Sequence, residues 1–200
     1  MRENADLVFT YDRGEAERYN LLLDSNRTYN TNVRAEKPAS FDNDVFFVGY
    51  AKDRLTDIVE IHRFLTENGI RCDFRVLGVP KNSRDYRGLE YLDEPIPYAE
   101  NLRLIERSAC LLEVAQSGSD SATLRVPEAV AYSRKLLSNV PTLQKEDYYN
   151  PAQMSVFDRA TNIDLRFLRA PMDYTGFSSL ETLAPAMRIR LYEEKLRELD

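Results

Sequence analysis

The central part of the chain alternates apolar runs with amphipathic stretches. Residues 44–49 (DVFFVG), 109–115 (ACLLEVA) and 135–139 (KLLSN) are short apolar runs, which are typical of strands buried on both faces of a sheet. Residues 53–69 and 98–108 repeat apolar positions with the period of a helix that buries one face. Strands that alternate with helices predict a mainly parallel sheet covered by helices on both sides. We therefore expect a three-layer, Rossmann-like α/β domain.

Further elements complete the predicted domain, which we place at residues 44–178. Residues 70–78 (IRCDFRVLG) predict a second strand, 89–92 (LEYL) a short one and 154–157 (MSVF) the last. A polar loop, 79–88, separates the first two of these. Right-handed crossovers between the strands would complete a single doubly wound unit.

The two ends of the chain have different patterns. Residues 5–12 predict a short strand, 13–23 a short helix or turn, and 24–43 are polar without periodicity, as in a linker. Residues 179–200 form a helical tail, with Pro185 near its start or at a kink. The chain thus divides into a remnant strand, helix and linker (1–43), the Rossmann-like domain and a C-terminal helix.

Composition narrows the classes of function. The 200 residues are 43% hydrophobic and 30% charged, which is enough apolar material for a packed core. The net charge of -6 argues against nucleic acid as the main partner, because phosphate binding requires a basic face. The N-terminus has no apolar signal-peptide core, and no apolar run reaches membrane-spanning length. We expect a cytoplasmic location, or one at the inner face of a membrane through a partner.

The sequence predicts no metal site. The two cysteines, Cys72 and Cys110, lie in strand-like apolar runs, and we expect buried, reduced thiols. The single histidine, His62, falls inside a helical pattern, where a surface or partly packed position is expected. No CxxC pair or Cys/His cluster is present.

The loop after the first core strand carries candidate ligand-binding groups. In doubly wound sheets, ligands bind at the carboxyl ends of the strands, where the strand order reverses. Gly49 would permit a tight turn and the close approach of a ligand. Lys52 and Arg54 would then face a diphosphate, although ordinary surface charges on a solvated turn are the alternative. The loop lacks GxGxxG, so no dinucleotide fingerprint is present.

A second loop, 115–125 (AQSGSDSATLR), is rich in small and hydroxyl residues before a predicted helix. Backbone N–H groups around Gly118 would favour an anion, whereas the hydroxyls can also act as helix caps. The hydroxyl residues are Ser117, Ser119, Ser121 and Thr123.

Arg125 and Glu128 follow on one face of that helix, three residues apart. One interpretation is a surface ion pair worth a few tenths of a kcal/mol. The other is a nucleotide site, in which the carboxylate accepts hydrogen bonds from ribose hydroxyls and the guanidinium meets a phosphate. The small apolar residues after Glu128 favour a buried face and hence the second interpretation.

Residues 44–80 and 96–139 together resemble the C-terminal half of bacterial GT-B glycosyltransferase-like proteins of capsular and lipopolysaccharide synthesis. The resemblance covers roughly residues 1–160. It rests on a glycine turn after the first strand (Gly49), a tyrosine-led helix at Tyr98 after Pro95-Ile96-Pro97, and a Glu-Ala helix at Glu128. In that family this half is the nucleotide-sugar-binding Rossmann domain.

The resemblance implies a metal-independent site for a nucleotide-diphosphate sugar as donor substrate, with no further cofactor. Glu128 would hold the ribose, and Leu77, Gly78 and Val79 would lie near the base. Lys52, Arg54 and Arg125 would neutralise the diphosphate. The complete set of predicted binding residues is Gly49, Lys52, Arg54, Gly78, Val79, Ile96, Gly118, Thr123, Leu124, Arg125 and Glu128.

The sequence departs from the family in what precedes the Rossmann domain. GT-B enzymes have two such domains, whereas residues 5–23 resemble only the last strand and interdomain link of the first. We therefore expect a sugar-transferring domain in surface polysaccharide synthesis that needs an N-terminal domain or partner chain to complete it. No catalytic residue is assigned, since an N-cap role is the simpler interpretation of Asp120.

Two other classes of function stay open. A non-catalytic GT-B-like interaction module, or a homo-oligomer formed through the N-terminal strand or the C-terminal helix, would also fit the missing half and the charged tail. A receiver-like signalling domain fits less well, because "FFVGYAKD" supplies no acidic cluster at the strand end.

Overall fold

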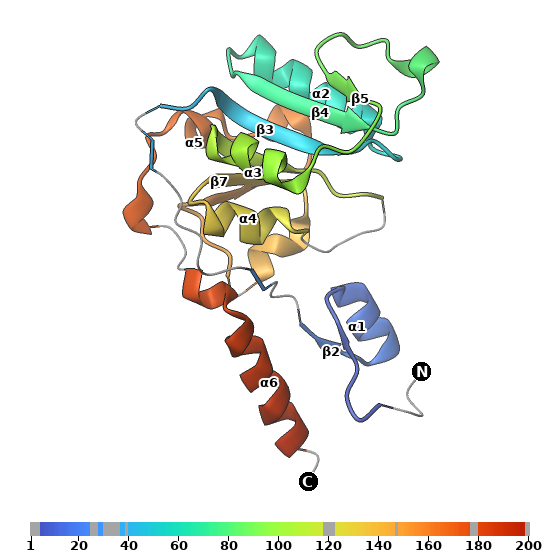
Figure 1. Ribbon diagram of the computed structural model, residues 1–200, viewed down its shortest axis with the longest axis vertical. Helices are drawn as coiled ribbons and strands as arrows, with labels where there is room; N and C mark the ends of the chain where they lie inside the picture. Colours follow the sequence, from blue (N-terminus) through green and yellow to red (C-terminus); the bar gives the residue numbers. More distant parts are fainter. Residues whose placement is uncertain are drawn as a thin grey trace.

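The computed structural model of the chain consists of a layered α/β domain with a small module beside it (Figure 1). The domain is built on one parallel sheet, and the module contains the first strands of the chain and its last helix. The structure describes residues 5–24, 28–29, 37–38, 40–117, 123–146, 148–176 and 180–198.

The central sheet has six strands, all parallel, in the order β5-β4-β3-β6-β7-β8. They are β3 (Asn43–Tyr50), β4 (Cys72–Leu77), β5 (Glu90–Leu92), β6 (Ser108–Glu113), β7 (Lys135–Ser138) and β8 (Met154–Val156). The predicted α/β fold and its six core strands are confirmed. The strand of this sheet that comes first in the sequence, β3, lies in the middle, with β4 on one side and β6 on the other, so the strand order reverses between β3 and β6.

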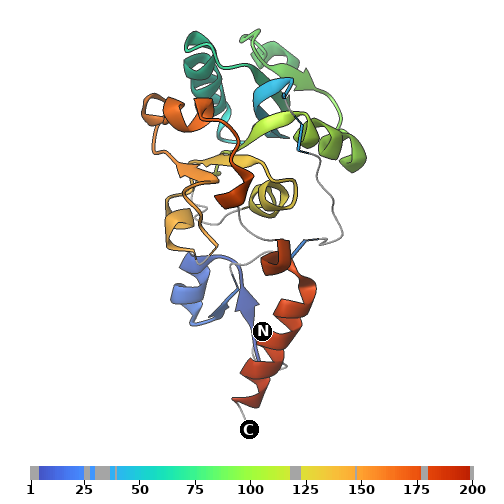
Figure 2. The ribbon, with the colours of Figure 1, turned by 90° about the vertical axis from the view of Figure 1, so that its left-hand side faces the viewer.

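Helices cover both faces of the sheet (Figures 1 and 2). On one side α2 (Leu55–Glu67) and α5 (Leu165–Arg169) pack over side chains such as Phe74 and Leu112. On the other, α3 (Tyr98–Glu106) and α4 (Arg125–Ala131) cover Phe46 and Leu111. Short 3-10 helices are η2 (Lys81–Ser83), η3 (Pro141–Lys145), η4 (Ala160–Asn162), η5 (Tyr174–Gly176) and η6 (Leu180–Leu183).

The spacing of apolar residues along α2 explains its place in the core. Ile58, Ile61 and Leu65 are spaced three and four residues apart, so they share one face. Each is at most 2% exposed. His62 lies beside them and is also buried, which corrects the expected surface or partly packed position. Its Nδ1 lies 2.9 Å from the hydroxyl of Tyr86, and burial lowers the pKa of the imidazole.

The beginning of the chain folds differently from the prediction. β1 is only Phe9–Thr10, α1 is Arg13–Tyr19, and β2 is Leu22–Leu23, which pairs in parallel with β1. The short helix or turn predicted over 13–23 is therefore confirmed as a helix for 13–19 and wrong for its last residues. Asn20 adopts the left-handed conformation with φ 50° and ends α1, and the following leucines become a strand.

The last helix, α6 (Pro185–Arg197), packs against these N-terminal strands (Figure 2). The rings of Phe9 and Tyr192 lie 4.6 Å apart. Asp24 forms an ion pair with Arg188 at 2.8 Å and accepts a hydrogen bond from the Tyr192 hydroxyl. Pro185 is the first residue of the helix, where its missing N–H costs nothing. No helix in the described ranges is long and apolar enough to cross a lipid bilayer.

Candidate functional site

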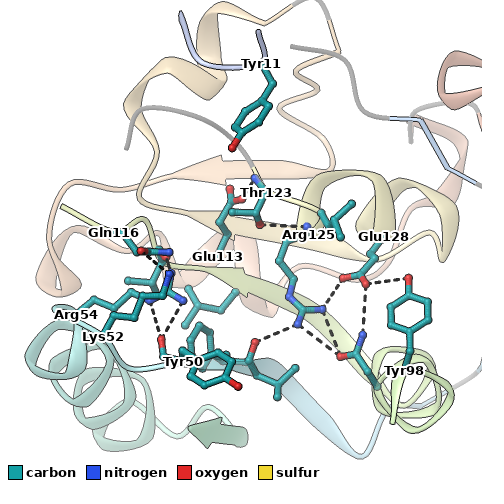
Figure 3. Close-up of a pocket in the computed structure, with 17 residues that line it drawn as sticks. Tyr11, Tyr50, Lys52, Arg54, Tyr98, Glu113, Gln116, Thr123, Arg125 and Glu128 are labelled. Carbon is teal, nitrogen blue, oxygen red and sulfur yellow. Dashed lines mark hydrogen bonds and ion pairs between the residues drawn. The ribbon is translucent and has the colours of Figure 1, made fainter. Parts of the chain in front are cut away.

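A cavity of about 570 Å³ lies at the point where the strand order reverses (Figure 3). Its floor is the carboxyl end of β3, from Phe47 to Tyr50, and the end of β6, from Leu112 to Val114. The starts of α3 and α4 contribute further walls, and Tyr11 reaches it from the N-terminal module. Two parallel strands that diverge at this position leave a crevice, which is where doubly wound folds bind their ligands.

One wall of the cavity is a network around Glu128. Its Oε2 lies 2.5 Å from Arg125 Nη1, and its Oε1 accepts from the hydroxyl of Tyr98 at 3.2 Å and from Asn101 Nδ2 at 3.3 Å. Arg125 also donates from Nη2 to the carbonyl oxygen of Val48, at 3.1 Å. The helix turn that carries the pair is thereby joined to both α3 and β3.

The Arg125–Glu128 contact is an ion pair three residues apart, as one sequence interpretation held, but it is not a surface pair. The Arg125 side chain is 15% exposed and that of Glu128 is 3% exposed. Burial raises the pKa of the Glu128 carboxyl, and the charge of Arg125 opposes that rise. A carboxylate in this position depends on its partners to stay ionised.

The opposite wall carries Lys52 and Arg54. Lys52 is exposed, has φ 46°, and donates from Nζ to Gln116 Oε1 at 2.9 Å. Arg54 donates to the carbonyl oxygens of Tyr50 and Val114, so its guanidinium joins the ends of β3 and β6. Burial lowers the pKa of Arg54. On this wall Lys52 is exposed to a ligand, whereas the Arg54 guanidinium is already bonded to backbone carbonyl oxygens.

Gly49 leaves room for Arg54. A Cβ at Gly49 would lie 3.3 Å from Arg54 Nη2 and 3.3 Å from Phe47 Cζ. Gly49 is a residue of β3 itself, and a larger residue there would displace the guanidinium that crosses between the strands.

Seven of the predicted binding residues line the cavity. These are Gly49, Lys52, Arg54, Thr123, Leu124, Arg125 and Glu128. Val79 and Ile96 pack in the cores on the two faces of the sheet. Gly78 does not line the cavity, and a Cβ added there would lie 3.1 Å from Cδ1 of the Tyr50 ring. Their contact with a ligand stays a prediction. Gly118, together with Ser119, Asp120 and Ser121, lies outside the described residues.

In the described ranges, no three His, Cys, Asp or Glu side chains gather closely enough to hold a metal ion. The described thiols, Cys72 and Cys110, are free, and burial raises the pKa of both, that of Cys72 to about 12.

Comparisons with known proteins agree with this architecture. No family model and no curated protein sequence matches the chain. Among solved structures, AviGT4, a glycosyltransferase involved in avilamycin A biosynthesis, is similar with a TM-score of 0.69 and 15% identity, over 96% of this chain and 63% of that one. The lipopolysaccharide outer core galactosyltransferase WaaB, in its apo form, is similar with a TM-score of 0.62 and 13% identity, over 98% of this chain and 63% of that one.

This chain has the fold of a GT-B half domain. It spans less than two thirds of the length of both neighbours. At 13–15% identity the similarity shows the fold, and the chemistry has to be argued from the residues of the cavity.

The sequence pattern did not identify two buried polar side chains of this domain, Glu113 and Asn101. Glu113 ends β6 and is 2% exposed; it accepts from the backbone N–H of Thr123 at 2.5 Å and from Ser138 Oγ at 2.7 Å. Asn101 is 6% exposed and bonds Glu128. A charged residue at the carboxyl end of an apolar strand was the available signal for Glu113, whereas nothing local marks Asn101.

Proposed function

We propose that this chain binds a nucleotide-diphosphate sugar in the cavity between β3 and β6 and acts as the donor half of a glycosyltransferase. The observation that carries the proposal is the placement of Lys52, Arg54 and Arg125 around one crevice at the reversal of strand order, beside the buried Glu128. Cationic side chains can neutralise a diphosphate leaving group without a metal ion.

The roles of individual residues follow from their exposure. Lys52 lies at the mouth and would exchange the amide oxygen of Gln116 for a phosphate oxygen. Glu128 would exchange its bond from Asn101 for one from a ribose hydroxyl, while Tyr98 and Arg125 would hold the carboxylate in place. Transfer to an acceptor also needs a group that deprotonates the acceptor hydroxyl, and we propose that a second domain or partner chain supplies it. Of the two carboxylates among the described lining residues, Glu113 has both oxygens bonded and Glu128 is assigned to the ribose.

The acceptor class we propose is a surface glycan. It is supported by the sequence resemblance to capsular and lipopolysaccharide enzymes and by the name of one structural neighbour, the lipopolysaccharide galactosyltransferase WaaB.

A panel of UDP, GDP, CDP, ADP and dTDP, each followed by thermal unfolding and calorimetric titration, tests the donor site. Ligand at about 100 times its dissociation constant adds about 2.7 kcal/mol to stability. For a domain of this size the midpoint should rise by roughly 5–10 °C. Lys52→Ala should weaken binding about tenfold or more, since a charge-assisted contact is worth about 1.5–3 kcal/mol. Lys145→Ala, an exposed lysine that does not line the cavity, is the matched control.

One observation favours a second candidate, a non-catalytic module that keeps the fold. Both oxygens of Glu128 are bonded within the protein and the residue is 2% exposed, which also suits a purely structural role. If no nucleotide at millimolar concentration shifted the unfolding midpoint, donor binding would be contradicted and the non-catalytic module would be the candidate that is left. Sedimentation of the chain, alone and without residues 180–200, would then test whether it self-associates.

A further inference from the structure

A second tyrosine stands behind the wall that holds Glu128. The hydroxyl of Tyr29 lies 2.7 Å from the hydroxyl of Tyr98. Tyr98 donates its own hydrogen to Glu128 Oε1, so its oxygen is left to accept from Tyr29. A relay of hydrogen bonds thus runs from Tyr29 through Tyr98 to the carboxylate. Tyr29 itself does not line the cavity.

The position of Tyr29 is set by the far end of the chain. Its backbone N–H donates to the carbonyl oxygen of Leu183, at 3.0 Å. Leu183 is 5% exposed and belongs to the core beneath α3 and α4, two residues before α6 begins. The Tyr29 ring packs against the same core. The relay therefore joins the segment that leads into α6 to the wall of the cavity.

Tyr98 needs such a support. It is the first residue of α3, is 54% exposed, and its neighbour Pro97 offers no side-chain cap. An exposed tyrosine samples several rotamers unless its hydroxyl is held. The bond from Tyr29 fixes the ring in the orientation that reaches Glu128.

We propose that Tyr29 is a positioning residue for the donor site, which acts on Glu128 through Tyr98 and ties the orientation of that carboxylate to the anchoring of the α6 segment. The inference rests on the proposed function, since Glu128 has to contact the donor nucleotide. It assigns a role to Tyr29, which falls in the stretch that the sequence indicated only as a linker.

Double-mutant titration tests this role. The affinity for whichever nucleoside diphosphate binds most tightly in the panel is measured for the unmodified chain, Tyr29→Phe, Tyr98→Phe and the double variant. Tyr29→Phe should weaken binding about 3–10-fold, and the double variant should bind no worse than Tyr98→Phe alone, because both remove one relay. The midpoint of Tyr29→Phe without ligand should stay within about 2 °C. Tyr19→Phe, an exposed tyrosine outside the relay and the cavity, should bind as the unmodified chain does.

Each other result decides between the two proposals. Unchanged affinity in Tyr29→Phe, or losses in Tyr29→Phe and Tyr98→Phe that simply multiply, would overturn the positioning role and leave donor binding intact. An unmodified chain that binds no nucleotide would overturn the proposed function, and the positioning role with it.

Discussion

The ion pair between Arg125 and Glu128 can be tested without any ligand. Arg125→Met keeps most of the side-chain volume and removes the charge. The carboxylate of Glu128 then keeps only the neutral donors Tyr98 and Asn101, and the carbonyl of Val48 loses its donor. A buried charge without its counter-charge is one of the few single changes with a large effect on stability.

The expected loss is about 3 kcal/mol at neutral pH. Breaking a buried ion pair on one side costs about 3–5 kcal/mol, and we take the lower end because the Arg125 side chain retains 15% exposure. In a domain of this size, 1 kcal/mol corresponds to roughly 2–4 °C, so the midpoint should fall by roughly 6–12 °C. Arg125→Met combined with Glu128→Met should recover more than half of the loss, because no buried charge is then left unpaired.

The loss should depend on pH in a defined direction. Burial raises the pKa of Glu128 above its ordinary value of 4.5, and removal of Arg125 takes away the charge that opposes this rise. The folded state then binds a proton more readily than the unfolded state. Stability should therefore fall as pH rises from about 4.5 through the folded-state pKa, and Arg125→Met should regain part of its stability when pH is lowered from 7.5 to 5.

Urea unfolding at pH 7.5 and pH 5 measures both effects. Arg103→Met is the matched control, because Arg103 and Glu100 on α3 form a pair with the same spacing but with side chains 72% and 40% exposed. That variant should lose at most about 0.5 kcal/mol. If Arg125→Met lost no more than Arg103→Met, or lost the same at both pH values, the description of a buried, mutually dependent pair would be refuted.

Two further predictions concern buried groups away from the cavity. Burial lowers the pKa of His62, so the chain should lose stability as pH falls below about 6.5. His62→Leu should flatten the slope of the unfolding midpoint against pH, and an unchanged slope would contradict this. Arg134 is fully buried and donates to the carbonyls of Ile105 and Glu106. Arg134→Met should lower the free energy of unfolding in urea by about 2–4 kcal/mol. A loss below about 1 kcal/mol would show that these carbonyls find other donors.

The parallel sheet was predictable because its strands are buried on both faces. An apolar run such as 44–49 is long enough to be recognised without knowledge of its neighbours, whereas its place in the middle of the sheet is seen only in the structure. Part of the site could also be predicted from the sequence. Lys52 and Arg125 are 73 residues apart, yet both follow parallel strands, whose carboxyl ends share one edge.

The small elements at the start of the chain were not predictable in the same way. β1 and β2 have two residues each, too few for a periodic pattern, and α6 packs on this segment through the Phe9–Tyr192 ring contact and the Arg188–Asp24 ion pair. The partners of Glu128 were hidden for a similar reason. Asn101 lies on α3 and Tyr29 precedes β3 outside any helix or strand, and only tertiary packing brings their polar atoms to the carboxylate or its relay.

The packing of α6 on the first strands affects the order in which parts of the fold can form during synthesis. Asp24 and Tyr192 are 168 residues apart. At about 5–20 residues per second, the ribosome needs roughly 8–34 s to synthesise the helix that completes the N-terminal module. The strands of the parallel sheet, the last of which ends at Val156, have all been synthesised by then. The N-terminal module lacks its helix until α6 is made, so the side of the cavity that Tyr11 lines is completed after the side that Lys52 and Arg125 line.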